Sequence, residues 1–102
     1  MPEHAVIVHF RYGQPGLEPL RAVESRLEAA LAKAGVGEFD GDEIAVNLAD
    51  GSLYMYGPDA DRLFAAIRPV LDATSFMCGA MVRLRYGPPA DGTRETVLII
   101  TC

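Results

Sequence analysis

The order of the periodic segments constrains the fold of this sequence more than any other feature: strand, helix, strand, strand, helix, strand, strand, within 102 residues. Residues 5–10 are mostly β-branched or aromatic, which is typical of a buried strand. Residues 18–34 place an apolar residue every three or four positions and predict a helix, with Pro19 in its first turn and Gly35 directly after it. A loop over 11–16, with two glycines and a proline, connects the two elements.

The middle of the chain predicts an acidic loop followed by a hairpin. Residues 35–43 are rich in glycine and acidic residues and are typical of a loop. Asp50-Gly51 is a two-residue turn signal, so we expect a hairpin there that leads into a strand over 52–56. The strand before this turn, residues 44–49, has the period of a half-buried strand and directs toward the helices its three larger apolar side chains, Ile44, Val46 and Leu48.

The last part of the chain repeats the succession of a helix and then strands. Pro58 and Asp59 favour the start of a second helix, whose apolar stripe ends at Leu71. Residues 80–86 and 95–101 predict the final two strands, because both are apolar and rich in β-branched or aromatic residues. The segment between them contains Pro-Pro and Asp-Gly turn signals.

Right-handed crossovers and the central hairpin together predict one ferredoxin-like α+β domain over residues 1–102. We expect a βαββαβ sandwich with an additional C-terminal strand. In this arrangement the antiparallel sheet has the strand order 5-4-1-3-2, and both helices pack on one face. The opposite face of the sheet is then free to act as a functional surface.

The composition restricts the class of protein. Half of the residues are hydrophobic, which argues against disorder, and the net charge of −5 disfavours nonspecific binding to nucleic acid or to an anionic membrane. Cys78 and Cys102 are too few for a disulfide scaffold or a zinc site with C-x2-C spacing. The first residues lack the features of a secretory signal, and no apolar run approaches ~18 residues. We therefore expect a soluble cytoplasmic protein without a membrane segment.

Side-chain alternation divides the strands between two faces. The open face receives a mixture of apolar, aromatic and charged side chains, with three arginines against one certain carboxylate, that of Glu43. The final strand is apolar on both sides, so either Val97 and Ile99 or Leu98 and Ile100 join this face. The candidate ligand-binding or interface residues on the open face are Ile7, His9, Arg11, Tyr54, Tyr56, Met81, Arg83 and Arg85.

This mixed face predicts a binding surface, because a sheet face in water normally alternates cleanly between apolar and polar positions. A homodimer formed through the open face or the outer strand is the first interpretation, since two-fold dimers are the commonest soluble oligomers. A small anionic ligand or a protein partner is the other interpretation. The placement is similar to an RNA-recognition motif, but the third strand lacks the basic, glycine-interleaved pattern of that family, and the net charge opposes nucleic-acid binding.

His9 supports an alternative, catalytic interpretation, because an unperturbed imidazole has a pKa of ~6.5 and can act as a general base. Tyr54 and Arg83 would then orient the substrate, as in cofactor-independent enzymes of the dimeric α+β barrel type. The sequence shows neither a positioned nucleophile nor paired carboxylates beside this histidine. The acidic loop lacks the residue order of a calcium-binding loop, and we predict neither a metal site nor a cofactor.

Two stretches, GVGEFDGDE and LYMYGPDADRLFAAIRPVL, resemble small uncharacterised bacterial proteins of ferredoxin-like type. The resemblance covers about a third of the chain. It implies the fold and a bacterial, cytoplasmic setting, but no particular chemistry. The sequence as a whole predicts a non-catalytic binding or regulatory module that forms a homodimer, with a small enzyme that uses His9 as the alternative.

Overall fold

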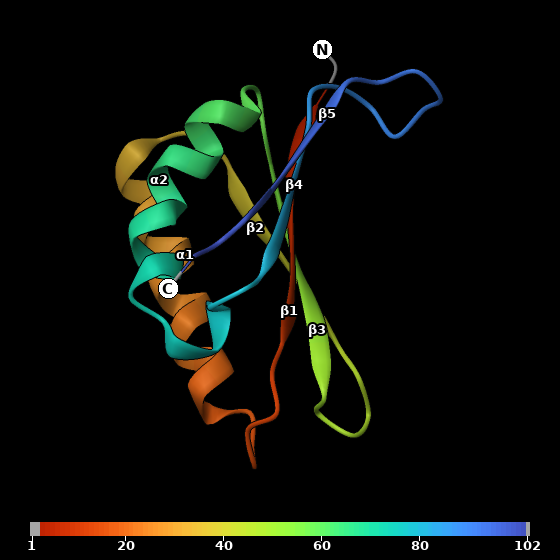
Figure 1. Ribbon diagram of the computed structural model, residues 1–102. Coiled ribbons are helices and arrows are strands. Elements are labelled where there is room, and N and C mark those ends of the chain that lie inside the picture. The colour runs from red at the N-terminus through yellow and green to blue at the C-terminus, as the bar shows by residue number, and fades with distance from the viewer. Residues whose placement is uncertain (1–2, 102) are drawn as a thin grey trace.

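The computed structural model describes residues 3–101, so Cys102 lies outside the described residues. Two helices and a five-stranded antiparallel sheet form an α+β fold (Figure 1). The sheet order, β2-β3-β1-β4-β5, confirms the order predicted from the sequence. The elements in chain order are β1 (His4–Arg11), α1 (Glu18–Ala34), β2 (Glu38–Ile44), β3 (Asp50–Gly57), α2 (Ala60–Asp72), the short helix η1 (Ser75–Met77), β4 (Met81–Arg85) and β5 (Glu95–Ile99).

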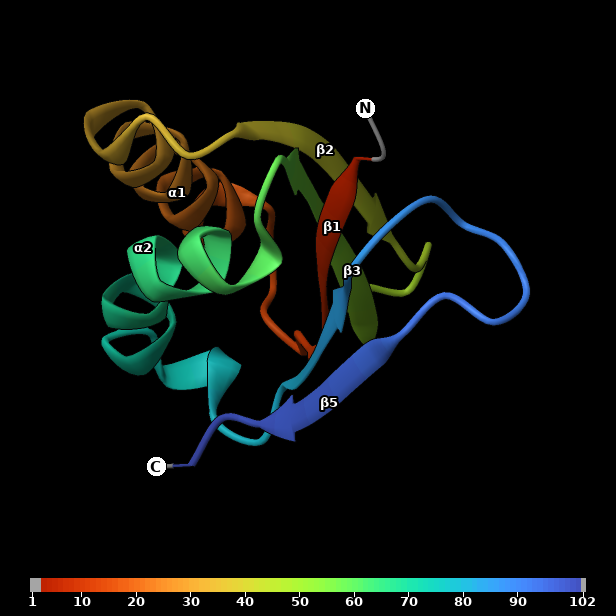
Figure 2. The ribbon, with the colours of Figure 1, turned by 90° about the horizontal axis from the view of Figure 1, so that it is seen from above.

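Both helices lie on the same side of the sheet, as Figure 2 shows from above. The hydrophobic core fills the space between the helices and this face of the sheet. Burial of each large apolar side chain stabilises the fold by about 1.5–3 kcal/mol. The largest fully buried side chains are Leu20, Leu27, Leu31, Leu53, Met55, Leu63, Ile67, Leu71, Met77, Ile100, Val6 and Val8.

Helix α1 begins and ends at the predicted residues. A proline in the first turn matches the helical backbone and leaves no intrahelical hydrogen bond unmade. Gly35 ends the helix in the left-handed conformation, with φ of 65°, and its N–H donates to the carbonyl of Leu31 at 2.9 Å. This geometry is favoured by glycine because a Cβ would crowd the backbone there.

The prediction was wrong for the strand and the turn within residues 38–51, although Ile44 and Leu48 pack against the core as expected. The acidic segment forms β2 instead of a loop, and the turn comes before Asp50, because Gly51 lies inside β3 opposite Ile44. A Cβ at Gly51 would lie 2.5 Å from Cδ1 of Ile44, so the glycine permits close packing here rather than a turn. The N–H of Ala45 donates to the carbonyl of Asp50 at 3.0 Å and closes the turn. Val46 is therefore fully exposed at the turn and does not face the helices.

Strand β2 forms one edge of the sheet and is irregular. Its register against β3 shifts between Phe39 and Gly41, which leaves Asp40 as the extra residue of a β-bulge. Gly41 takes a positive φ of 117° at this point. A bulge and a row of acidic side chains both disfavour the addition of another strand, so β2 is a protected edge.

A buried acidic residue connects α1 to β2. Glu24 is 7% exposed. Nη1 of Arg21 lies 2.8 Å from Oε1 of Glu24 and 2.5 Å from Oδ2 of Asp42, which belongs to β2. Burial, together with a hydrogen bond to Asp42, raises the pKa of Glu24 to about 7. The same hydrogen bond, with the guanidinium of Arg21, lowers the pKa of Asp42. The two carboxyl groups are therefore most stable when Glu24 holds a proton.

Helix α2 is capped from two directions. The side chain of Asp59 accepts hydrogen bonds from the N–H groups of Asp61 and Arg62, as an N-cap aspartate does. Nδ1 of His4 accepts from the N–H of Ala60 at 3.0 Å, which ties the start of β1 to the start of α2. These contacts fix the helix over the central strands and leave the other face of the sheet uncovered.

Candidate functional site

Cross-strand pairing arranges the side chains of the open sheet face in rows. Every candidate residue named from the sequence lies on β1, β3 or β4, the three central strands. The first row contains Glu38, Tyr56, Ala5, Arg85 and Glu95. The second contains Tyr54, Ile7, Arg83 and Val97, and the third contains Glu43, Ser52, His9, Met81 and Ile99.

The register of β5 decides a question that its sequence leaves open. Val97 pairs with Arg83, and Ile99 pairs with Met81, so both apolar side chains lie on the open face. They are 51% and 53% exposed. Ile100 is instead buried in the core. The open face therefore gains two exposed apolar side chains at its outer edge.

The open face is more acidic than the sequence indicates. Alternation places Glu38, Asp50 and Glu95 on this face together with Glu43. Glu38 joins the open face because β2 begins earlier than predicted, and Asp50 joins it because β3 includes this residue. The register of β5 places Glu95 there as well. The arginines are thus balanced by carboxylates over the whole face, and any preference for anions must come from a smaller region within it.

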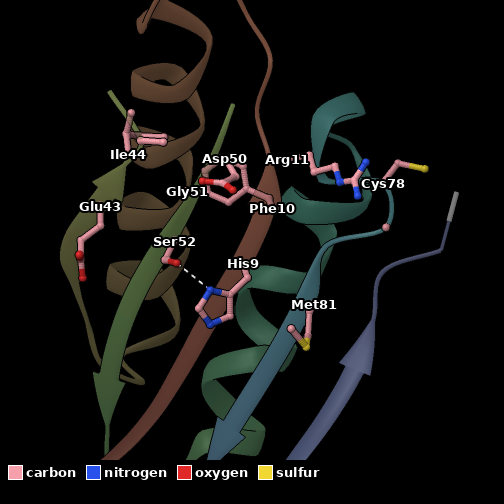
Figure 3. Close-up of a pocket in the computed structure, with 12 residues that line it drawn as sticks. His9, Phe10, Arg11, Glu43, Ile44, Asp50, Gly51, Ser52, Cys78 and Met81 are labelled. Atoms are coloured by element: carbon pink, nitrogen blue, oxygen red, sulfur yellow. Dashed lines mark hydrogen bonds between the residues drawn. The ribbon is translucent and has the colours of Figure 1, made fainter. Parts of the chain in front are cut away.

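His9 and Ser52 form a hydrogen-bonded pair at one end of the open face. Ser52 Oγ lies 2.7 Å from Nδ1 of His9, and the two residues are cross-strand partners (Figure 3). They line an open depression of about 790 Å³, to which Met81, Arg11 and Asp50 also contribute. Ser52 was not among the predicted residues. Its position two residues before Tyr54 puts it on the same face, but only the register of β1 and β3 shows that it meets the histidine.

Arg83 and Arg85 lie beside a second depression, of about 620 Å³, bordered by Ile7 and the loop after β4. Nε of Arg83 is buried and has no hydrogen-bond partner within residues 3–101. Oε1 of Glu95 is 3.9 Å away, so the two groups form an ion pair at a distance too long for a hydrogen bond. Nε of Arg85 donates to the carbonyl of Gly87 at 2.8 Å, which orients that guanidinium at the rim of the depression.

The two tyrosines of β3 lie on the acidic side of the face. The hydroxyl of Tyr54 donates to Glu43 at 2.6 Å, and this hydrogen bond raises the pKa of Tyr54. Tyr54 and Tyr56 border a third, smaller depression of about 320 Å³ together with Asp40 and Asp42. The tyrosines and Arg83 therefore line separate depressions, and neither tyrosine shares the depression of His9. This separation does not favour stacking of bases between aromatic and arginine side chains.

Comparisons with known proteins found no match: no family model, no curated protein and no solved structure matches this chain. Within residues 3–101, no group of three or more His, Cys, Asp or Glu side chains could hold a metal ion. None of the described helices combines the length and the apolar character that a membrane crossing requires.

Proposed function

We propose that this protein is a non-catalytic binding module, and that its open sheet face binds a small organic anion beside Arg83 and Arg85. The observation that supports this most directly is Nε of Arg83, which is buried and makes no hydrogen bond within the described residues, its one charged neighbour being the ion-paired carboxylate of Glu95. A buried donor without a partner costs about 1–3 kcal/mol, more when it is charged, so a ligand that accepts from it gains binding energy.

The chemistry of the depression restricts the class of ligand. A guanidinium presents a planar fork that suits carboxylate and phosphate oxygens. Asp91 and Glu95 border the same depression and oppose the entry of a multiply charged anion. Ile7 supplies an apolar contact next to the two arginines. A monovalent carboxylate with an apolar or aromatic part fits these constraints best.

Benzoate is a suitable probe, and the arginine Nε–H signals in ¹⁵N NMR spectra report directly on the site. We expect benzoate to shift the signals of Arg83 and Arg85 saturably, with a dissociation constant on the order of a millimolar for so small a ligand. Benzyl alcohol, which lacks the charge, should leave both signals in place. The Arg83→Gln variant should lose saturation at Arg85, whereas Arg26→Gln, at an exposed position of α1, should retain it.

Either of two results would refute this proposal. One is a linear drift of all arginine signals with benzoate, since that is the response of nonspecific ion pairing. The other is a titration of the Arg83→Gln variant that matches the wild type. In both cases Nε of Arg83 would lack a hydrogen bond without serving as part of a ligand site.

The contact between Ser52 and His9 supports a second candidate, a small cofactor-independent enzyme. In that function Nδ1 of His9 accepts the hydroxyl proton while Ser52 Oγ attacks an ester carbonyl, and the alcohol then leaves with that proton. Water, with His9 again as base, releases the acid from Ser52. The residues that sequence reasoning assigned to substrate orientation, Tyr54 and Arg83, do not line this depression. Hydrolysis of p-nitrophenyl acetate tests this candidate, and a wild-type rate no faster than that of the Ser52→Ala variant would exclude it.

A further inference from the structure

The outer edge of β5 presents backbone groups in a regular pattern. The N–H of Ile100 donates to Ala80, and the carbonyl of Arg94 accepts from Tyr86, so both groups point toward β4. In an antiparallel ladder the inward and outward backbone groups alternate along the strand. The N–H and carbonyl groups of Glu95, Val97 and Ile99 therefore point away from β4, where no strand pairs with them within residues 3–101.

Apart from the charge of Glu95, this edge lacks the bulge, proline and lysine that protect an edge strand. Strand β2, at the other end of the sheet, carries a bulge and several carboxylates, whereas residues 95–99 read ETVLI, without proline, glycine or lysine. The only charged residue of β5, Glu95, stands at its start. A regular, apolar edge strand of this kind favours pairing with another chain. Figure 2 shows its outer side clear of both helices.

We propose that a second copy of this chain pairs antiparallel with β5 about a two-fold axis at Val97, which joins two sheets into one. In this register Val97 lies opposite Val97 of the second copy, and Glu95 lies opposite Ile99 of the second copy. Every outward N–H and carbonyl of the three residues then finds a partner, giving six backbone hydrogen bonds, since each of the three pairs exchanges two.

Charge and shape favour this register over its neighbours. An axis at Glu95 would place two carboxylates directly opposite each other, which is destabilising. An axis at Ile99 would pair fewer residues of β5. With the axis at Val97, the two glutamates lie at opposite ends of the paired strands, and two β-branched valines are cross-strand neighbours. The open faces of both copies lie on the same side, so the two Arg83 depressions share one surface.

Light scattering across a dilution series measures the assembly in the intact chain. The wild type should have twice the monomer mass of 11.0 kDa at high concentration and dissociate on dilution. The Val97→Pro variant removes the N–H at the axis but no hydrogen bond to β4, so it should be a folded monomer. Val97→Lys, which brings two like charges together and keeps the N–H, should also be monomeric. Val97→Thr retains the β-branch and the N–H and should remain dimeric.

Hydrogen exchange tests the same pairing without substitution. In a monomer the amides of Thr96 and Leu98 are protected by β4, whereas those of Glu95, Val97 and Ile99 exchange rapidly. In the proposed dimer the exchange of the latter three should slow by on the order of tenfold or more as the concentration rises. A wild-type monomer at all concentrations would overturn the proposal. So would a dimer that persists in Val97→Pro but is lost in Ile7→Asp, because that dimer uses the open face.

Discussion

Replacement of Glu24 with glutamine should make the protein more stable above neutral pH and change little in mild acid. The carboxyl of Glu24 is buried, and burial together with the hydrogen bond to Asp42 raises its pKa from 4.5 to about 7. A raised pKa means that the folded protein binds the proton more tightly than the unfolded chain. The stabilisation is therefore complete below the unfolded pKa of 4.5 and is lost as the pH rises through about 7.

The size of the effect follows from the shift. Each pKa unit corresponds to about 1.4 kcal/mol, so loss of the proton from Glu24 lowers the free energy of unfolding by roughly 2–3 kcal/mol between about pH 5 and pH 8. Glutamine resembles the protonated acid in shape and does not titrate. The lowered pKa of Asp42 stabilises the folded protein above the usual aspartate pKa of 3.8, and this stabilisation is lost only at lower pH, outside this range.

Urea unfolding followed by circular dichroism at the two pH values measures this difference. With a slope of about 1–3 kcal/mol per molar urea, the midpoint of Glu24→Gln should exceed that of the wild type by ~1–2 M at pH 8 and match it at pH 5. Every other side chain is common to both proteins, so the comparison isolates residue 24. Glu28→Gln, at an exposed position of the same helix, is the control. A constant difference between Glu24→Gln and wild type at both pH values would refute the reasoning.

Two further predictions concern the packing around β3 and the serine–histidine pair. Gly37→Ala should lower the free energy of unfolding by more than ~2 kcal/mol, because its φ is 155° and its Cβ would lie 2.2 Å from the carbonyl oxygen of Tyr56. Gly16→Ala has no atom within 4 Å of the new Cβ and should stay within about 1 kcal/mol of wild type in the same urea assay. If Ser52 is a nucleophile, Ser52→Ala and His9→Gln should each reduce p-nitrophenyl acetate hydrolysis by ~100-fold or more, with equal losses because the pair acts as a unit. His4→Gln should retain the rate, and equal rates in all variants would contradict the catalytic candidate.

The fold could be predicted from the sequence because the hydrophobic periodicity of the segments and the handedness rule for their connections indicate the same topology. The apolar stripes of residues 18–34 and of the second helix, together with strands on either side, leave few arrangements that satisfy right-handed crossovers. The strand order follows from those constraints alone. The position of β2 could not be predicted in this way. Apolar and small or polar residues alternate over 44–49 as they do in a strand, although most of these residues form the turn.

Tertiary packing decided the position of the turn. Asp50-Gly51 has the composition of a hairpin turn, but inside the strand a Cβ at position 51 would lie 2.8 Å from the carbonyl oxygen of Glu43 and 2.5 Å from Cδ1 of Ile44, so glycine is favoured there. These contacts depend on the register of β3 against β2, which the composition of the turn does not contain. The same limit applies to the site: alternation placed His9 on the open face, but the contact with Ser52 depends on the register between two strands.

The central position of β1 has a consequence for the order in which the chain folds. Strand β1 is paired on one side by β3 and on the other by β4, both of which come much later in the sequence. During synthesis both edges of β1 therefore stay unpaired while α1 and β2 are made. Closing such long loops costs entropy before any contact is gained, which makes folding slower than in a chain with local pairings. Until β3 and β4 are made, both edges of the apolar strand β1 are open to association with other chains.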